Sequence, residues 1–306
     1  MSSMAESQDS WTVGRLLAWT TSYLRDHGSD SPRLDAELLL AEARGCRRID
    51  LYTAFDEVVG EPARGAFRDL VRRRAAGTPV AYLLGRRDFY SLSFRVGPGV
   101  LIPRPETETL VVALLDLARA AASQADDGPS SASTGAIEVA DVGTGSGVIA
   151  VCAAKHLPRA RLTAIDSSGA ALEIARRNAA DHGVADRIEF IESDLFAAVA
   201  PERRFDFVAS NPPYVRADEY QRLSEGIRRH EPRAALVAGE KGTEVIERLL
   251  DQAGERLRGG GRLIVEVSPM IHDAVLALFA ADARFEPPVT VKDAERRPRV
   301  VHARRR

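Results

Sequence analysis

The 306-residue chain has few cysteines, no long apolar run and no basic, apolar leader. Its two cysteines, Cys46 and Cys152, form no CxxC pair, so we expect no disulfide framework and a reducing compartment. No stretch approaches the roughly 18 uninterrupted apolar residues of a membrane helix. The first residues, "MSSMAESQDS", lack the basic start and apolar segment of a signal peptide. These absences predict a cytoplasmic protein with no membrane partner.

Excess charge of either sign is also missing. The chain has 42 basic and 44 acidic side chains, a net charge of −2, so no global field favours nucleic acid or an anionic membrane. Its six histidines are scattered without ligand spacing, and we predict no metal site. The tail "ERRPRVVHARRR" holds six arginines that could touch RNA, but we interpret it as a solvated charged terminus.

The first part of the chain, up to about residue 80, has helical patterns. In "SPRLDAELLLAEARG", Ser31 stands at an N-cap position, Pro32 at the first helical position and Gly45 at the stop. A second segment, "EPARGAFRDLVRRRAAG", runs to Gly77 with its arginines on an expected solvent face. The patterns predict a small helical domain over residues 1–84.

A change of periodicity follows. The stretch "RDFYSLSFRVGPG" alternates as a half-buried hairpin strand does, and one expected face carries Tyr90, Leu92, Phe94 and Val96. The next segment, "LIPRPETETLVVALLDLARAAA", predicts a helix that starts at Pro105. After it, the small polar residues of "SQADDGPSSASTG" are typical of a mobile loop.

From Ile137 onward, strands and helices alternate. The predicted strands are "IEVADV", "RLTAID", "RIEFIES", "FDFVAS" and "GRLIVEVS", mostly separated by helical segments such as "ALEIARRNAADHG". Such alternation predicts an α/β fold, a mostly parallel sheet with helices on both faces. Ligands bind at the carboxyl ends of the strands in such sheets.

The first of these strands runs into a glycine-rich loop, "ADVGTGSGVIAV". Glycines at 143, 145 and 147 permit a tight turn and a close approach of a ligand to the main chain. A Walker loop is excluded because no Gly-Lys-Ser/Thr follows, and the dinucleotide fingerprint needs a glycine where Val148 stands. The acid before the glycines, Asp141, would crowd a pyrophosphate and suits an ammonium group. Alone, the loop could equally be a tight turn.

Two further acids end the next strands. Asp166 in "TAIDSS" is placed to take a ribose diol, and Asp194 in "ESDLF" lies beside Leu195 and Phe196, which suit an adenine. Each acid alone could be a helix cap or a solvated turn. Together with the glycines they describe a nucleoside with a cationic amino-acid tail and no phosphate, for which S-adenosylmethionine fits.

The fourth strand ends in a rigid turn, "NPPY". The prolines fix φ, donate no hydrogen bond and hold the preceding residue extended. The Asn211 side-chain oxygen and the Pro212 carbonyl could accept both hydrogens of a planar NH2 group, with Tyr214 over its flat face. Two acceptors return electron density to the nitrogen and align it with the methyl group, so positioning supplies most of the catalysis. A structural turn with a packed tyrosine is the alternative.

These motifs resemble those of a known family. "DVGTGSG" with "NPPY" is similar to the amino-methyltransferases of adenine, guanine or glutamine. "GTPVAYLLGRRDFYSLSFRVGPGVLIPRPETETLV" resembles the segment that joins the two domains of the HemK/PrmC enzymes, peptide chain release factor N5-glutamine methyltransferases. "LDAELLLAEARG" resembles their helical domain, and "HEPRAALVAGEKG" their segment after NPPY. The resemblance covers nearly the whole chain.

The resemblance implies an architecture and a reaction. It implies a helical substrate-docking domain over 1–84, a β-hairpin connection over 85–104, and a Rossmann-like S-adenosylmethionine-dependent methyltransferase domain with a C-terminal antiparallel hairpin over 105–306. The substrate would be the glutamine in the Gly-Gly-Gln motif of class I release factors, with no nucleic-acid substrate.

The resemblance also implies catalytic and binding roles for the residues of this chain that match the family's motifs. The catalytic residues are expected to be Asn211, Pro212 and Tyr214. The substrate would be held by Asn211, Pro212, Pro213 and Tyr214, and by Arg104 in the PRP stretch. The PRP stretch could instead serve only as the turn between the hairpin and the helix. The cofactor would contact Asp141, Gly143, Thr144, Gly145, Ser146, Gly147, Asp166, Asp194, Leu195 and Asn211.

The sequence departs from the family in two places. The loop around 122–135 is longer than expected, and Leu195 stands where some relatives carry tryptophan, which leaves open how the adenine is sandwiched. The alternatives are a ribosomal-protein glutamine or nucleic-acid amino methyltransferase and a non-catalytic cofactor-binding scaffold. Near-neutral charge counts against nucleic acid.

Overall fold

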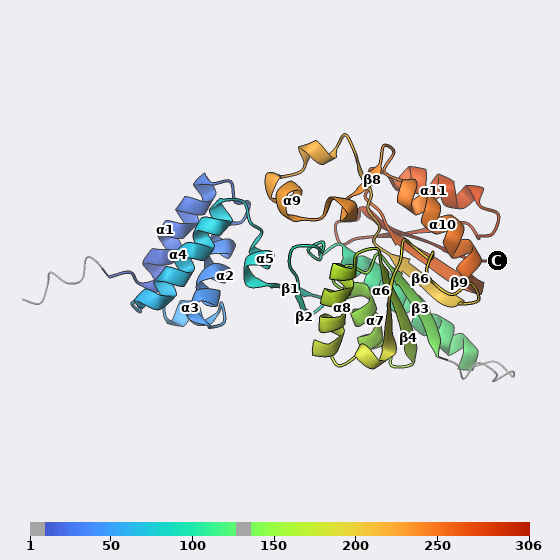
Figure 1. Ribbon diagram of the computed structural model, residues 1–306, viewed down its shortest axis with the longest axis horizontal. Helices are drawn as coiled ribbons and strands as arrows, with labels where there is room; N and C mark the ends of the chain where they lie inside the picture. The colour runs from blue at the N-terminus through green and yellow to red at the C-terminus, as the bar shows by residue number, and fades with distance from the viewer. Residues whose placement is uncertain (1–9, 127–135) are drawn as a thin grey trace, which may run out of the picture. The chain divides into compact units, whose positions relative to one another are not determined.

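The computed structural model describes residues 10–126 and 136–306, which form two compact units (Figure 1). Within these residues, one unit comprises 10–85 with Glu225–His230, and the other comprises 86–126, 136–224 and Glu231–Arg306. Most of the loop predicted around 122–135 lies outside the described residues. Its first residues, up to Asp126, are helical, because helix α6 extends further than the sequence pattern indicates.

Helices make up the first unit, as predicted. They are α1 (Val13–Asp26), α2 (Pro32–Arg44), α3 (Asp50–Thr53), α4 (Glu61–Ala75), α5 (Val80–Leu84) and α9 (Glu225–His230). Helix α2 has Pro32 in its first turn and ends at Gly45 in the left-handed region (φ 62°), as expected. Ser31 makes no side-chain capping bond, however; the Ser29 hydroxyl instead donates to Asp35 at 2.7 Å.

The apolar faces of α1, α2 and α4 meet in one core. Leu17, Leu39, Leu40 and Phe67 are each at most 3% exposed and belong to the same buried cluster. Burying a side chain of this size stabilises the fold by roughly 1.5–3 kcal/mol. This unit therefore has a hydrophobic core of its own.

A seven-stranded sheet organises the second unit, in the order β10-β11-β9-β6-β3-β4-β5. Its strands are β3 (Ile137–Val142), β4 (Ala160–Asp166), β5 (Ile188–Glu192), β6 (Phe205–Ser210), β9 (Leu257–Glu266), β10 (Val289–Lys292) and β11 (Pro298–Arg304). Strands β5, β4, β3, β6 and β9 are parallel, while β11 is antiparallel to β9 and β10. The predicted parallel sheet and C-terminal antiparallel hairpin are confirmed.

Helices cover both faces of this sheet (Figure 1). One face packs against α6 (Thr107–Asp126), α7 (Val148–His156) and α8 (Gly169–Asp181), and the other packs against α10 (Glu244–Arg256) and α11 (His272–Ala281). Shorter elements connect them: η1 (Ala185–Arg187), η2 (Tyr220–Arg222), η3 (Arg233–Ala235), and the paired strands β7 (Val215–Arg216) and β8 (Val237–Gly239).

The hairpin near residue 90 differs in detail from the expected strand. Strand β1 (Arg86–Phe89) pairs with β2 (Leu92–Arg95) across a two-residue turn in which Tyr90 and Ser91 both have positive φ, 49° and 59°. Such turns match the twist of the strands they join. The turn interrupts the alternation, so Phe89 is buried beside Phe94, and Tyr90 is not part of the strand.

The arginine-rich C-terminus is a strand and not the solvated tail that its composition suggested. Val300, Val301 and His302 in β11 are buried between β9 and β10, and even Arg299 is only 7% exposed. The composition misled because the middle of "PRVVHAR" is buried on both faces of the sheet: Val300 packs in one core and Val301 and Ala303 pack in the other.

The strand order reverses direction at β3. From β3 the chain builds outward through β4 and β5, and then returns to add β6 and β9 on the other side. The last residue of β3, Val142, is in register with Ile165 of β4 and Ser210 of β6. The glycine loop, Asp166 and NPPY therefore start level with one another at the switch point, where open α/β sheets bind ligands.

Candidate active site

The glycine loop leaves β3 with its backbone in the left-handed region. Gly143, Gly145 and Gly147 have φ of 74°, 55° and 84°. At Gly147 a Cβ would lie 3.0 Å from the Cβ of Ala175, so the close approach of α7 and α8 also requires glycine. Asn178 of α8 anchors the loop by donating to the Ser146 carbonyl at 2.7 Å.

Asp141 lies beneath this loop and is fully buried. Its Oδ2 accepts from the Thr144 hydroxyl at 2.6 Å and from the Ala150 amide at 3.0 Å. Its Oδ1 has no hydrogen-bond partner among the described residues. Burial raises the pKa of the Asp141 carboxyl to about 7, although the Thr144 and Ala150 hydrogen bonds act to lower it. An unpartnered buried oxygen fits a cationic partner that the chain itself does not supply.

Asp166 ends β4 and accepts hydrogen bonds from both neighbouring loops. The Gly145 amide donates to its Oδ2 at 2.8 Å, and the Ser168 amide donates to its Oδ1 at 2.9 Å. Burial raises the pKa of this carboxyl, and the amide hydrogen bonds oppose the rise. The carboxylate thus tightens the glycine loop while one side of it lines the pocket.

Asp194 and Leu195 follow β5. The Asp194 carboxylate pairs with Arg248 of α10 at 2.6 Å, and both side chains are more than half exposed. Leu195 has a φ of 51°, a conformation that favours glycine. A ligand that binds Asp194 must share its carboxylate with Arg248, a residue that sequence analysis missed because it lies 54 positions away.

The NPPY turn follows β6. Nδ2 of Asn211 donates to the Thr107 hydroxyl at 3.1 Å, and Ser210 donates to the Val142 carbonyl at 2.6 Å. Pro212 is buried, and the Tyr214 ring packs against the cluster that includes Val267 and Ile271. Burial raises the pKa of the Tyr214 hydroxyl to about 12, and the Glu266 carboxyl contributes to the rise.

Arg104 is part of a partly buried ion pair. It donates to Glu231 at 2.6 Å, and the Ile102 amide donates to the other oxygen of the same carboxylate at 3.2 Å. Glu231 is only 5% exposed and belongs to the "HEPRAALVAGEKG" segment. The pair fastens the PRP stretch to the segment after NPPY. No local pattern indicates this contact, because the two residues are 127 positions apart.

These loops surround a pocket of about 390 Å³. The predicted site residues that line it are Gly143, Gly145, Asp166, Asp194, Leu195, Asn211, Pro212 and Pro213. The predicted residues that do not line it are Asp141, Thr144, Ser146, Gly147, Tyr214 and Arg104. Lining residues that sequence analysis did not name include Gly99, Leu101, Ser168, Ser193, Val245 and Arg248.

The pocket suits a nucleoside with a cationic tail. It combines glycine backbone with a carboxylate at each of two strand ends. Behind the glycine loop, the buried Asp141 carboxyl keeps one oxygen without a hydrogen-bond partner among the described residues. More of its exposed lining is apolar than polar, as a base and a sugar require. The donor set therefore fits S-adenosylmethionine.

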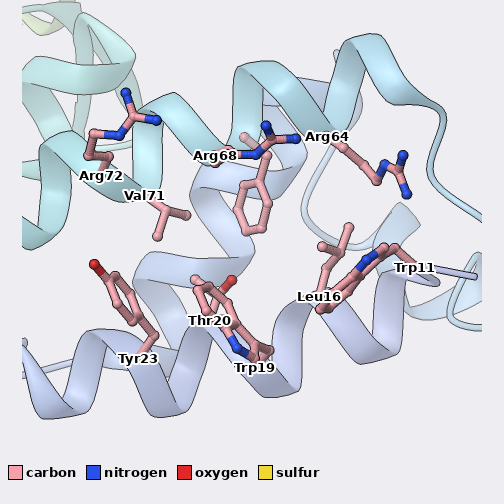
Figure 2. A pocket seen from close by; sticks show the side chains of 10 residues that line it. Trp11, Leu16, Trp19, Thr20, Tyr23, Arg64, Arg68, Val71 and Arg72 are labelled. Atoms are coloured by element: carbon pink, nitrogen blue, oxygen red, sulfur yellow. The ribbon is translucent and has the colours of Figure 1, made fainter. Parts of the chain in front are cut away.

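A second hollow, of about 440 Å³, lies on the helical unit between α1 and α4 (Figure 2). We call it the aromatic hollow. Its residues are Trp11, Leu16, Trp19, Thr20, Tyr23, Arg64, Phe67, Arg68, Val71 and Arg72. Trp19 and Tyr23 stack with ring centroids 4.9 Å apart, and Trp19 is 52% exposed. The arginines come from successive turns of α4.

Comparison with known families agrees with both units. The PrmC N-terminal domain model matches residues 15–85, and the methyltransferase small domain model matches residues 131–228. The chain is similar in fold to the solved hMettl16 catalytic domain, with a TM-score of 0.50 and 16% identity over 75% of this chain and 81% of that one.

Curated relatives are similar over nearly the full length. The release factor glutamine methyltransferase of Rhodopirellula baltica is 48% identical over 97% of this chain and 98% of its own. That of Geobacter sulfurreducens is 38% identical over 90% and 91%, and that of Chlorobaculum tepidum is 41% identical over 84% and 85%. With relatives this similar across both of its units, the chain belongs to the HemK/PrmC family of release factor glutamine methyltransferases.

Proposed function

We propose that this chain transfers a methyl group from S-adenosylmethionine to the side-chain amide nitrogen (N5) of the glutamine in the Gly-Gly-Gln motif of class I release factors, in the cytoplasm. The observation that carries the proposal is the pocket at the switch point, which brings the glycine loop and Asn211 of NPPY together. When bound, S-adenosylmethionine supplies a methyl group on a positively charged sulfur.

Residues from three strand ends would hold the cofactor. The unpartnered oxygen of Asp141 attracts its ammonium group, Asp166 accepts from the ribose hydroxyls, and Asp194 with Leu195 borders the base. Thr144 acts indirectly by fixing the Asp141 carboxyl. Because Asp194 already pairs with Arg248, we expect it to contribute less to affinity than Asp166.

Asn211 and Pro212 would hold the reacting amide. With Nδ2 of Asn211 engaged by Thr107, its Oδ1 is the atom that can accept from the substrate, and the Pro212 carbonyl can accept the second hydrogen. Both acceptors increase electron density on a nitrogen whose lone pair is otherwise delocalised. The nitrogen loses one proton overall, and no strong base is needed because an N-protonated amide is a strong acid.

The aromatic hollow would dock the release factor. Within the described residues, the ion pairs of its arginines are with surface carboxylates of their own helix: Arg64 and Arg68 pair with Glu61, and Arg72 pairs with Asp69. Such exposed pairs are worth about 0–1 kcal/mol each and can be exchanged for those of a partner. Among the aromatic rings that line the hollow, Trp19 is 52% exposed and Phe67 is buried. This combination suits an acidic segment that inserts an apolar side chain.

Transfer of labelled methyl from S-adenosylmethionine to purified release factor tests the function, with ribosomal proteins, tRNA and DNA offered as competing acceptors. We expect label on the release factor and its loss when the glutamine is changed to alanine. Preferential label on a competitor would support another amino methyltransferase, and cofactor binding without transfer to any acceptor would support a scaffold.

Docking is tested separately. Arg68→Glu and Trp19→Ala should reduce methylation of intact release factor at least tenfold while leaving methylation of a short Gly-Gly-Gln peptide unchanged. Arg47→Glu, at an exposed position outside the hollow, is the matched control. Equal losses on factor and peptide would contradict a docking role.

A further inference from the structure

Glu266, at the end of β9, is a buried acid without an evident partner. It is 0% exposed, and neither carboxyl oxygen makes a regular hydrogen bond among the described residues. Each polar group buried in this way needs an explanation, because desolvation without compensation costs stability. The proposed cofactor and substrate contacts do not use it.

The sheet places Glu266 beside the NPPY turn. Val265 is in register with Ser210 of β6, so Glu266 and Asn211 are the next residues on two adjacent parallel strands. Ile264 contributes to the core on the α6 side and Val265 to the opposite core. By alternation, Glu266 faces α6, whose first residue is Thr107.

Thr107 links Glu266 to Asn211. It is 2% exposed, and its hydroxyl accepts from Asn211 Nδ2 at 3.1 Å. The same hydroxyl stabilises the ionised Glu266 carboxyl, although their arrangement falls short of a regular hydrogen bond. The three side chains therefore form a short row that leads from a buried carboxyl to the pocket.

The direction of the hydrogen bonds along this row decides which atom Asn211 presents to the pocket. A hydroxyl has one hydrogen and can accept as well. If Thr107 gives its hydrogen to Glu266, it can only accept from Asn211, so Nδ2 must face Thr107 and Oδ1 faces away. If the hydrogen went to Asn211, the amide would reverse and present its NH2 group to the NH2 group of the substrate.

We propose that Glu266 is a positioning residue: by taking the Thr107 hydrogen, it holds the Asn211 amide with its oxygen turned to the substrate. The inference rests on the proposed function for what Asn211 binds. Glu266 does not touch the substrate or the cofactor.

Protonation of Glu266 should reverse the direction of the hydrogen bonds along this row. Burial raises the pKa of Glu266 to about 7; Thr107, Arg299 and Arg104 oppose the rise, Glu106 adds to it, and Tyr214 lies nearby without charge. A protonated Glu266 can itself donate to Thr107, which frees the hydroxyl hydrogen for Asn211 Oδ1. The productive orientation is therefore present above a pH of about 7 and is lost as the pH falls through it.

Single-turnover methyl transfer at saturating cofactor and release factor, from about pH 5.5 to 8.5, tests the rate. We expect the parent rate to fall up to about tenfold per pH unit below pH 7. Glu266→Gln keeps an acceptor but has no proton to gain, so its rate should vary far less with pH. Thr107→Val should be slow at every pH and Thr107→Ser should restore the rate, while Thr109→Val on the same helix is the matched control.

A readout without catalysis separates this inference from the proposed function. Side-chain carboxyl ¹³C NMR should give Glu266 a pKa near 7, and Thr107→Val, which removes a stabilising donor, should raise it, whereas Thr109→Val should not. A parent pH profile retained in Glu266→Gln, or a Glu266 pKa indifferent to Thr107→Val, would overturn the inference. Absence of methyl transfer by the parent would contradict the proposed function alone, since the NMR titration still tests the row.

Discussion

Cofactor affinity should depend on pH through Asp141, the buried acid beneath the glycine loop. Its pKa is raised from an ordinary 3.8 to about 7 by burial, so near neutral pH much of the free protein carries a protonated Asp141. An ammonium group beside it requires the ionised form. Binding must therefore release a proton whenever the pH lies below about 7.

The magnitude follows from that pKa. Each pH unit below it adds about 1.4 kcal/mol to the cost of ionising Asp141, or about tenfold in the dissociation constant. Between pH 8 and pH 6 the affinity should fall about tenfold, with most of the change below pH 7. Replacement by asparagine should weaken binding at pH 8 and remove most of this pH dependence.

Calorimetric titration with S-adenosylhomocysteine measures the effect without turnover. Buffers of different ionisation enthalpy count the protons released, which should approach one at pH 6 and zero at pH 8. Methylthioadenosine, which has the nucleoside but no amino-acid tail, is the matched ligand and should bind independently of pH. Equal pH dependence for both ligands, or its persistence in Asp141→Asn, would refute the role given to Asp141.

The same group links stability to pH in the opposite sense. Since the folded pKa lies above the unfolded value, the contribution of Asp141 is fully present below about pH 4 and is lost as the pH rises through about 7. Without ligand, Asp141→Asn should therefore raise the melting temperature at pH 8 more than at pH 5. A larger gain at pH 5 would mean that the carboxyl is ionised in the folded protein.

Four further substitutions test the site. Gly147→Ala should lower the free energy of unfolding by about 2 kcal/mol or more, because it forces a left-handed alanine against Ala175; a chemical denaturation curve measures this, and an unchanged midpoint would contradict it. Asp166→Ala should weaken cofactor binding by roughly 1.5–3 kcal/mol, as titration can show, while leaving the secondary structure intact. Asn211→Ala should reduce turnover by about 10²–10³, and Asn211→Asp should bind cofactor at least as well as the parent yet turn over much more slowly in single-turnover assays.

Much of the fold could be predicted from local chemistry. The strand ends at Val142, Asp166 and Ser210 were predicted correctly, since apolar runs and the residues that break them are read within one segment. The glycine loop was predictable for the same reason, because glycine adopts the positive φ values of this turn without steric cost. The β-turn at Tyr90 and Ser91 was not, because neither residue is typical of positive φ.

Long-range partners could not be predicted in the same way. Arg104 was predicted to hold the substrate, whereas its ion pair with Glu231 was not predicted, because Glu231 is a distant residue with which it shares no pattern. Asp194 and Arg248 likewise meet only because α10 packs next to the loop after β5. The sequence shows which groups are charged, but which of them form ion pairs depends on how the helices and loops pack.

The protonation states of buried acids are the property that the sequence predicts least. Asp141 and Glu266 both lie near the ends of apolar strands and both acquire a pKa of about 7, because burial removes water from each carboxyl. Protonation of the two carboxyls should nevertheless affect different steps, because their surroundings differ. Asp141 keeps an unpartnered oxygen below a pocket for a cation, so its proton should control binding. Glu266 lies behind Thr107 and Asn211, so its proton should control turnover once both ligands are bound. The effect on binding and the effect on turnover should both have a midpoint near pH 7, so a pH profile of the parent enzyme alone cannot separate them. Asp141→Asn should alter the dissociation constant and Glu266→Gln the saturated rate, and only that division would show that each carboxyl acts at its own step.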